Sequence, residues 1–322
     1  MKLSIVIPSR NGGSILQRHL HEVARQASAV TGGAEILIVD DASDHQGDDT
    51  AQVAASAGAI VRLIASPTHR GFAATCNLGA RQAVGEFLLF LNNDMHLHDG
   101  CLQRLVALLA VRPDVFAVSP TIVNQAQQFV ESTTRLVWRR GTLDLRFPGR
   151  EGDPGPGADR ERNVAYACGG AMLCRRDLFH SLGGFCELLS PFYWEDAELG
   201  LRAWQAGLSS LETGAAFATH DHAQTIGARY TSREIRVIYE RHRLLSIWLH
   251  LDDSVGWFSH LTWLPPRWLW SLLRGRPLAL ALPQAIARWR EVIVLRRSRR
   301  ASRREECLWA AVREAGGTGW PE

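Results

Sequence analysis

The sequence predicts an α/β fold in which a mostly parallel central sheet carries helices on both faces. Runs of apolar and β-branched residues alternate with longer segments of helical periodicity over residues 3–118. This alternation is typical of parallel strands joined by crossover helices, because strands covered on both faces are apolar throughout. Polar residues follow three of the strands, where open α/β sheets bind ligands.

The expected elements follow one another at short spacing. Four apolar runs are expected to be buried strands, at 3–7, 35–39, 60–64 and 86–91. Apolar periodicity predicts helices at 14–30, 49–57, 71–84 and 100–111, and another apolar stretch follows at 116–118. The segment 148–163 is rich in Pro, Gly and charge, so we expect a mobile surface loop there.

The polar residues after the strands form three groups: Ser9-Arg10-Asn11, Asp40-Asp41 and Asn92-Asn93-Asp94. Any one group could simply cap the following helix, but three groups at one sheet edge favour a ligand site. A carboxylate at the end of a buried strand is held rigidly, and Mg²⁺ or Mn²⁺ takes oxygen ligands from carboxylates and substrate phosphates. Asp94 is therefore the candidate metal ligand.

Acidic residues open the helix expected at 194–207. One interpretation of Glu195 and Asp196 is an acidic first turn, which the helix dipole favours. The other is a general base for attack by a hydroxyl group. His220, in THDHAQT, could be a metal ligand, a phosphate contact or only a polar surface residue.

Six motifs now support a resemblance, in this order: SIVIPSRNG at 4–12, ILIVDDASD at 36–44, RGFAATCNLGA at 70–80, FLLFLNND at 87–94, GGAMLCRRDLFHSLGGF at 169–185 and YWEDAELGLRAWQAG at 193–207. The chain resembles a family 2 glycosyltransferase with the GT-A (nucleotide-diphospho-sugar transferase) fold over residues 3–225. Within that family it looks most like the branch that contains bacterial rhamnosyltransferases. The resemblance implies a catalytic domain at 1–225.

The resemblance assigns roles to individual residues. The nucleotide-sugar site would comprise Pro8, Ser9, Arg10, Asn11, Asp40, Asp41, Arg70, Asn77, Asn92 and Asn93. Within it, Asp40 would contact the base and Asp41 would lie near the ribose. Asp94 ends the family's DxD element, and Asp196 would be the catalytic base, with Glu195 in reserve. Trp194 would lie on the acceptor side, and His220 would be a second metal ligand.

The same resemblance implies a reaction. An inverting, metal-assisted transfer would move a sugar from a UDP- or dTDP-linked donor to a cell-surface glycan or lipid-linked acceptor. The first position of the DxD element is Asn92 rather than Asp, which leaves one firm carboxylate for Mn²⁺ or Mg²⁺. The alternatives are a non-catalytic nucleotide-sugar-binding or membrane-partner subunit, a sugar-nucleotide nucleotidyltransferase and a glycoside hydrolase, which also uses two carboxylates.

Residues 226–322 differ from the rest in charge, with 17 Arg against nine acidic residues. Six Trp lie within 244–295, and Pro265-Pro266 and Pro283 interrupt the apolar runs. A spanning helix needs about 20 apolar residues. We therefore expect a helical region that lies on an anionic membrane surface, or else one that packs on the catalytic domain with its Arg solvated. No recognition motif accompanies the charge, so nucleic acid is not an expected partner.

The expected location is the cytoplasmic, inner face of a cell membrane, with the protein bound peripherally. The apolar run 3–7 is too short for a signal peptide. The six cysteines form no CxxC pair, which favours reduced, mostly buried thiols. No GxxxxGK[ST] is present, and Gly183-Gly184 lacks the GxGxxG spacing, so a dinucleotide cofactor is not expected.

Overall fold

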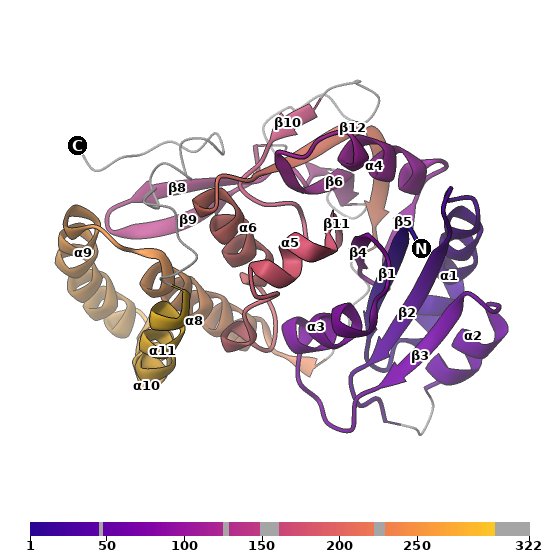
Figure 1. The fold of residues 1–322 in the computed structure, drawn as a ribbon. Coiled ribbons are helices and arrows are strands. Elements are labelled where there is room, and N and C mark those ends of the chain that lie inside the picture. Colours follow the sequence, from indigo (N-terminus) through magenta and orange to yellow (C-terminus); the bar gives the residue numbers. More distant parts are fainter. Residues whose placement is uncertain (45–47, 125–128, 149–160, 222–228, 300–322) are drawn as a thin grey trace.

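The computed structural model describes residues 1–44, 48–124, 129–148, 161–221 and 229–299. Its centre is one sheet with the strand order β10-β12-β6-β11-β4-β1-β2-β3 (Figure 1). Four neighbouring strands run parallel: β1 (Leu3–Ser9), β2 (Ala34–Asp40), β3 (Val61–Ala65) and β4 (Phe87–Leu91). These are the four strands that the apolar runs predict.

The second half of the sheet is mixed in direction. Strand β11 (Ala171–Arg175) runs antiparallel between β4 and β6 (Val115–Asn124), whereas β12 (Ser209–His220) is parallel to β6. Three short strands pair antiparallel at its margin: β5 (Met95–Leu97), β7 (Phe129–Val130) and β10 (Glu161–Asn163). A separate hairpin consists of β8 (Arg135–Arg139) and β9 (Thr142–Arg146).

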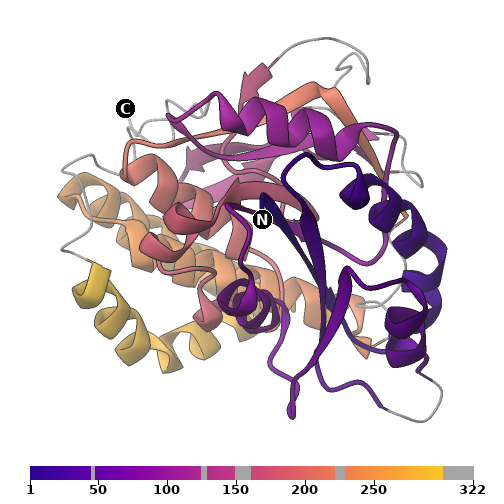
Figure 2. The same ribbon diagram turned by 45° about the vertical axis from the view of Figure 1, so that its right-hand side comes forward.

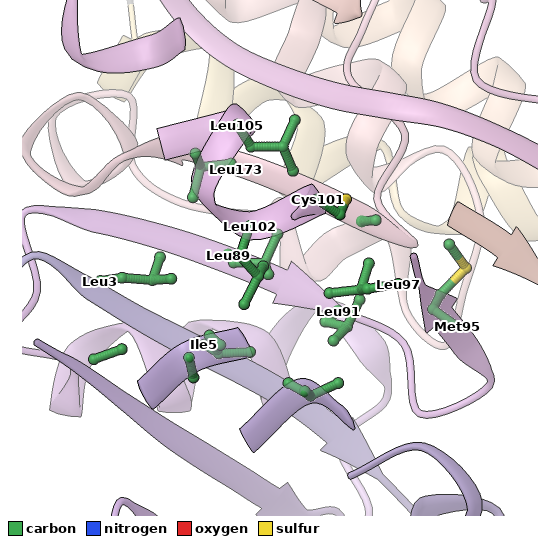
Figure 3. Close-up of a cluster of buried hydrophobic side chains, with 14 of the residues drawn as sticks. Leu3, Ile5, Leu89, Leu91, Met95, Leu97, Cys101, Leu102, Leu105 and Leu173 are labelled. Carbon is green, nitrogen blue, oxygen red and sulfur yellow. The ribbon is translucent and has the colours of Figure 1, made fainter. Parts of the chain in front are cut away.

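Helices cover both faces of the sheet. Because side chains alternate along a strand, Leu3, Ile5 and Ile7 of β1 pack in one cluster and Val6 in another. The first cluster lies under α1 (Gly13–Ser28) and α4 (Cys101–Ala110), as Figure 3 shows around Leu102 and Leu105. Short α2 (Thr50–Ser56) packs beside α1. The opposite face carries α3 (Phe72–Gln82), α5 (Arg176–Ser181) and α6 (Glu195–Gln205).

Four further helices gather at the end of the molecule away from α1 and α2 (Figures 1 and 2). They are α8 (Ser232–His250), α9 (Ser254–Leu273), α10 (Leu278–Ala287) and α11 (Trp289–Arg299). A third apolar cluster joins them to α6 and to the β8–β9 hairpin, through residues such as Trp138, Leu201 and Ile247. The described parts of 1–225 and 226–322 therefore share a core.

Several expectations meet the structure only in part. The segment expected as a loop, 148–163, falls largely on residues 149–160, which lie outside the described ranges, and Glu161–Asn163 forms β10. Within the described ranges, none of the helices is both long enough and apolar enough to cross a membrane. The five cysteines described are free thiols, four of them buried, whereas Cys307 lies outside the described residues.

Candidate active site

The carboxyl ends of β1 and β2 are tied together by hydrogen bonds. The Asp41 N–H donates to the Ser9 carbonyl over 2.8 Å. The Asn11 N–H donates to Ser43 Oγ over 2.7 Å, and that hydroxyl in turn lies 2.5 Å from Asp40 Oδ1. The polar groups after the first two strands thus form one connected unit, as the position of parallel strand ends predicts.

Asp41 anchors the loop that precedes α3. Its carboxylate accepts hydrogen bonds from the Arg70 N–H at 2.7 Å and the Gly71 N–H at 2.9 Å. Its Oδ2 also lies 2.7 Å from His69 Nδ1. The buried carboxylate is therefore committed to holding residues 69–71, and contact with a ribose stays a prediction. Arg70 itself forms an exposed ion pair with Glu187 at 3.2 Å.

Arg10 and Asn93 complete this edge. The Nε and Nη1 atoms of Arg10 are buried without a hydrogen-bond partner among the described residues. Buried N–H groups without partners are costly, so these two donors are suited to an anionic ligand. Asn93 Nδ2 lies 3.4 Å from Ser9 Oγ, which brings the turn after β4 against the end of β1. Pro8 is half-buried within β1.

Asn77 lies in a different place from these residues. Its amide binds the backbone of Phe185 twice, at 2.9 Å in each direction. It also lines a pocket of about 800 Å³ between α3, the turn at 183–188 and α11, which includes Arg81 and Arg288. None of Asp94, Asp196 or His220 lines that pocket. The nucleotide-binding role expected for Asn77 stays a prediction, and its contacts give it a structural one.

Asp94 and His220 are brought together by strand pairing. In the antiparallel β5–β12 pair, His220 is opposite Met95. Asp94 Oδ1 therefore lies 3.2 Å from His220 Nε2, while Glu131 Oε1 lies 2.5 Å from His220 Nδ1. Burial alone would lower the pKa of His220, but the hydrogen bonds to Asp94 and Glu131 raise that pKa to about 10. The imidazolium thus stands between two carboxylates.

The side chains around Asp94 are of the chemical types that bind divalent metal ions. They comprise carboxylate oxygens, which both Mn²⁺ and Mg²⁺ accept, and the imidazole of His220, whose nitrogen can bind Mn²⁺ only after it has lost its proton. No group of three or more His, Cys, Asp or Glu within the described ranges is arranged to hold a metal. One or two protein ligands plus substrate phosphates is the arrangement usual for Mg²⁺. A site completed by a bound diphosphate fits these residues.

Two adjacent glycines connect Asp196 to the turn that carries Asn92 and Asp94. Its Oδ2 accepts a hydrogen bond from the Gly169 N–H at 3.1 Å, and the next residue, Gly170, accepts one from the Asn92 N–H at 2.9 Å. A Cβ on Gly169 would lie 3.2 Å from Asp196 Oδ2, so this close approach depends on glycine. The candidate base and the turn that carries the candidate metal ligand therefore lie on either side of one pair of glycines.

Burial raises the pKa of both acidic residues at the start of α6. For Asp196 the hydrogen bonds from Gly169 and Ala197 oppose that effect. For Glu195 the charge of Asp196 adds to it, and Oε2 of Glu195 is buried without a partner among the described residues. The two carboxyl groups thus differ, since Asp196 has donors that stabilise its anion. Asp196 is the better-supported base.

Comparison with known proteins decides the family. The model of Glycosyl transferase family 2 matches residues 4–183. The chain belongs to glycosyl transferase family 2. This glycosyltransferase is 26% identical over 324 residues to the N-acetylglucosaminyl-diphospho-decaprenol L-rhamnosyltransferase of Mycobacterium tuberculosis, covering 94% of this chain and 96% of that protein. The rhamnosyltransferase-like resemblance is thereby confirmed.

Two other similarities are more partial. The glycosyltransferase is 30% identical over 218 residues to polypeptide N-acetylgalactosaminyltransferase 3 of Taeniopygia guttata. That match covers 63% of this chain but only 35% of the relative, so the chain spans about a third of its length. The crystal structure of GalNAc-T7 with UDP, GalNAc and Mn²⁺ superposes with a TM-score of 0.60 at 19% identity, over 79% of this chain and 48% of that one. The expected GT-A fold is confirmed.

Two neighbouring aromatic side chains of this glycosyltransferase differ in exposure. Trp194 is only 1% exposed and packs in the third apolar cluster, and the acceptor-side position expected for it stays a prediction. Tyr193, which sequence reasoning passed over, is 39% exposed. Both residues have positive φ, 71° and 76°, a strained conformation for non-glycine residues. This bend directs the Tyr193 side chain outward just before Glu195.

Glu131 is the other residue that sequence reasoning missed. It lies just after β7, in a stretch without clear strand or helix periodicity, so nothing in the sequence distinguished it. Only the pairing of β7 with β6 and of β6 with β12 carries it to His220. The glycosyltransferase thus has an additional carboxylate beside the expected Asp94–His220 pair.

Proposed function

We propose that the protein is an inverting, metal-assisted glycosyltransferase that uses a nucleoside-diphosphate sugar. One observation supports the proposal: Gly169 binds Asp196 and the adjacent Gly170 binds Asn92, so the candidate base lies close to the turn that carries Asp94. This arrangement supplies a base for the acceptor on one side and ligands for the leaving diphosphate on the other. If the acidic residues served only to favour the start of the helix, Asp196 would not need its hydrogen bond from Gly169.

The proposed reaction is a single displacement. Asp196 takes the proton from an acceptor hydroxyl while the hydroxyl oxygen attacks the anomeric carbon. The attack comes from the face opposite the diphosphate, whose bond to the sugar breaks, so the anomeric configuration inverts. Asp94, and His220 once its imidazole has lost a proton, would hold Mn²⁺ or Mg²⁺, which when bound supplies positive charge that stabilises the departing diphosphate.

The donor side would use the connected unit at the ends of β1 and β2. Asp40 is buried and can accept hydrogen bonds, which supports the expected contact with the base. The unpartnered Nε and Nη1 of Arg10 support contact with an anionic part of the donor. The structures similar in fold include a complex with UDP, and UDP- or dTDP-linked sugars are the proposed donors here.

The acceptor is proposed to be a cell-surface glycan or a lipid-linked sugar. The relative in Mycobacterium tuberculosis is named for a decaprenol-diphosphate acceptor, and the described part of this chain has an apolar surface that fits a lipid environment. Helix α9 exposes a row of apolar residues on one side: Val255, Phe258, Leu261, Leu269, Leu272 and Leu273. A large exposed apolar patch is typical of a protein or membrane contact.

Peripheral binding to the cytoplasmic face of an anionic membrane is part of the proposal, and that surface supports it. The structure changes which residues are available for it. Trp248 is buried, and Arg288, Arg296 and Arg299 bind groups within the protein, so they are not free for lipid. Exposed Trp263, Trp270 and Trp289 remain, with Arg276 over the Trp270 ring at 3.9 Å. Aromatic and cationic side chains together suit the membrane interface.

The test is a transfer assay with UDP- and dTDP-sugars and Mn²⁺. We expect slow release of the nucleoside diphosphate from one donor in water alone, and faster release with an acceptor lipid extract. NMR of the product should show the anomeric configuration opposite to that of the donor. A protein that binds the nucleotide but never releases it from the sugar would be a non-catalytic binding subunit, and retention of configuration would overturn the proposed displacement.

A further inference from the structure

The third carboxylate of helix α6, after Glu195 and Asp196, is fully buried. Glu198 has 0% of its surface exposed and lies two residues after Asp196. It is ringed by groups from three helices: Arg202 of α6 at 2.6 Å, His250 of α8 at 3.0 Å and Arg299 of α11 at 2.6 Å. The C-terminal helices are thus bound directly to the helix that carries the candidate base.

The contacts around Glu198 extend to the backbone. Arg202 also donates hydrogen bonds to the carbonyls of Leu182 and Gly184, the latter at 2.7 Å. His250 Nδ1 lies 2.8 Å from Gln205 Oε1, near the end of α6. Burial opposes the charge of Glu198, but Arg202 and Arg299 hold the pKa of its carboxyl well below the usual range. A fully buried carboxylate stays ionised only with such partners.

The geometry of α6 links the contacts of Glu198 to the position of Asp196. Successive residues of an α-helix are turned by about 100°, so Asp196 and Glu198 lie on roughly opposite sides of α6. Asp196 meets Gly169 on one side, and Glu198 meets Arg299 on the other. The helix is therefore held between the site and the C-terminal helices, and a turn of α6 about its axis would move the Asp196 carboxylate.

We propose that Arg299 is a positioning residue, which aligns Asp196 for catalysis by fixing α6 through Glu198. This inference rests on the proposed role of Asp196 as the base. It makes residues 289–299 a part of the catalytic unit rather than an appendage. Arg299 reaches α6 from 101 residues away in the sequence, so local helix propensity cannot substitute for it.

The experiment compares Arg299→Met with Arg297→Met and Arg299→Lys in the full chain. Arg297 is exposed on the same helix and forms no ion pair with a described residue, so it is the matched control. We expect Arg299→Met to lower kcat for transfer by about tenfold to a hundredfold, as misplacement of a catalytic group does. The Kd for the donor should stay within about twofold, and Arg299→Lys should recover part of kcat.

A double-mutant cycle separates positioning from general stability. If Arg299 acts through Glu198, Arg299→Met should cost much less kcat in a Glu198→Gln background, because interacting residues are not additive. Equal costs in both backgrounds would overturn the proposal. So would a fall in Tm for Arg299→Met with kcat unchanged. If Arg299→Met does not fold, Arg299→Lys is used for the same comparison.

A result independent of the reaction distinguishes the two proposals. Hydrogen exchange of the amides in 195–205 should be faster in Arg299→Met than in Arg297→Met. If the wild type transfers no sugar yet this difference appears, the proposed function fails while Arg299 still fixes α6. If exchange is the same in both variants, the positioning role of Arg299 is wrong whatever the activity.

Discussion

The backbone N–H of Gly169 donates a hydrogen bond to Oδ2 of Asp196 over 3.1 Å. The next carbonyl, that of Gly170, accepts from the Asn92 N–H at 2.9 Å. Two adjacent residues without side chains therefore hold a carboxylate of α6 on one side and the turn after β4 on the other. The first two predictions test this arrangement.

Asp196→Asn should abolish most of the transfer while it leaves the donor site intact. The amide keeps the size of the side chain but cannot take the proton, and loss of a general base costs about 10²–10⁴-fold in rate. Donor affinity, measured by calorimetry with Mn²⁺, should hardly change, because the base acts on the acceptor. Glu195→Gln is the companion variant, and wild-type turnover in both would refute the assignment.

Gly169→Ala should reduce turnover more than Gly170→Ala. A Cβ at Gly169 would lie 3.2 Å from both Cβ and Oδ2 of Asp196, whereas one at Gly170 would lie 3.5 Å from its nearest neighbours, an ordinary contact. The carboxylate must therefore shift in the first variant only. Turnover and donor affinity of the two proteins give the comparison, and equal turnover would show that this approach is not needed.

Asp94→Ala should remove metal-dependent nucleotide binding. Asp94 is the single carboxylate of the turn after β4, and its partner His220 cannot supply the oxygen ligands that a hard cation prefers. Calorimetry with UDP and dTDP, with and without Mn²⁺, measures the loss. Asp114→Ala, which removes an exposed carboxylate paired with Arg112, serves as the control. An unchanged affinity for metal and nucleotide would contradict the role of Asp94.

As the pH is lowered, turnover should begin to fall at a higher pH than it would if the base were an aspartate with an ordinary pKa. Burial raises the pKa of Asp196 above 3.8, and only its carboxylate can act as the base. The folded state therefore binds this proton more tightly than the unfolded state, so its uptake favours the folded state as the pH falls. A loss of rate with Tm retained is expected. Constant turnover down to the ordinary aspartate range would contradict it.

The apolar row on α9 should carry membrane binding. Phe258 and Leu273 are 75% and 76% exposed, so Phe258→Asp with Leu273→Asp should release the protein from vesicles that contain anionic lipid without unfolding it. Val111→Asp, at a residue 73% exposed beside α4, is the matched control. High salt should release part of the wild type, because exposed charges are screened. Retention of the double variant would reject this surface.

The sequence could predict the parallel half of the sheet because each strand there is a local signal. Each of the four strands is a short apolar run that meets the next through a helix, so burial and order follow from composition. The position of β11 could not be predicted in this way. Its insertion between β4 and β6 depends on pairings with partners distant in the sequence.

The candidate site shows the same limit. Asp94 and Asp196 stand in motifs whose order along the chain reflects the family, and His220 follows the last of these motifs. The structure brings Asp94 to His220 and Asp196 to the Gly169–Gly170 turn. Tyr193 could not be chosen over Trp194, because backbone conformation at this bend decides which ring is buried. Glu131 depends on strand pairing in the same way.

The contact between Glu198 and Arg299 has a consequence for how the protein is made. During synthesis the two residues leave the ribosome 101 residues apart. Domains of a nascent chain generally fold from the N-terminus as they emerge, and here α6 would emerge with one buried carboxylate still lacking its distant cation. The sheet can form early, but the helix that carries the base can reach its final place only after residue 299 has been translated.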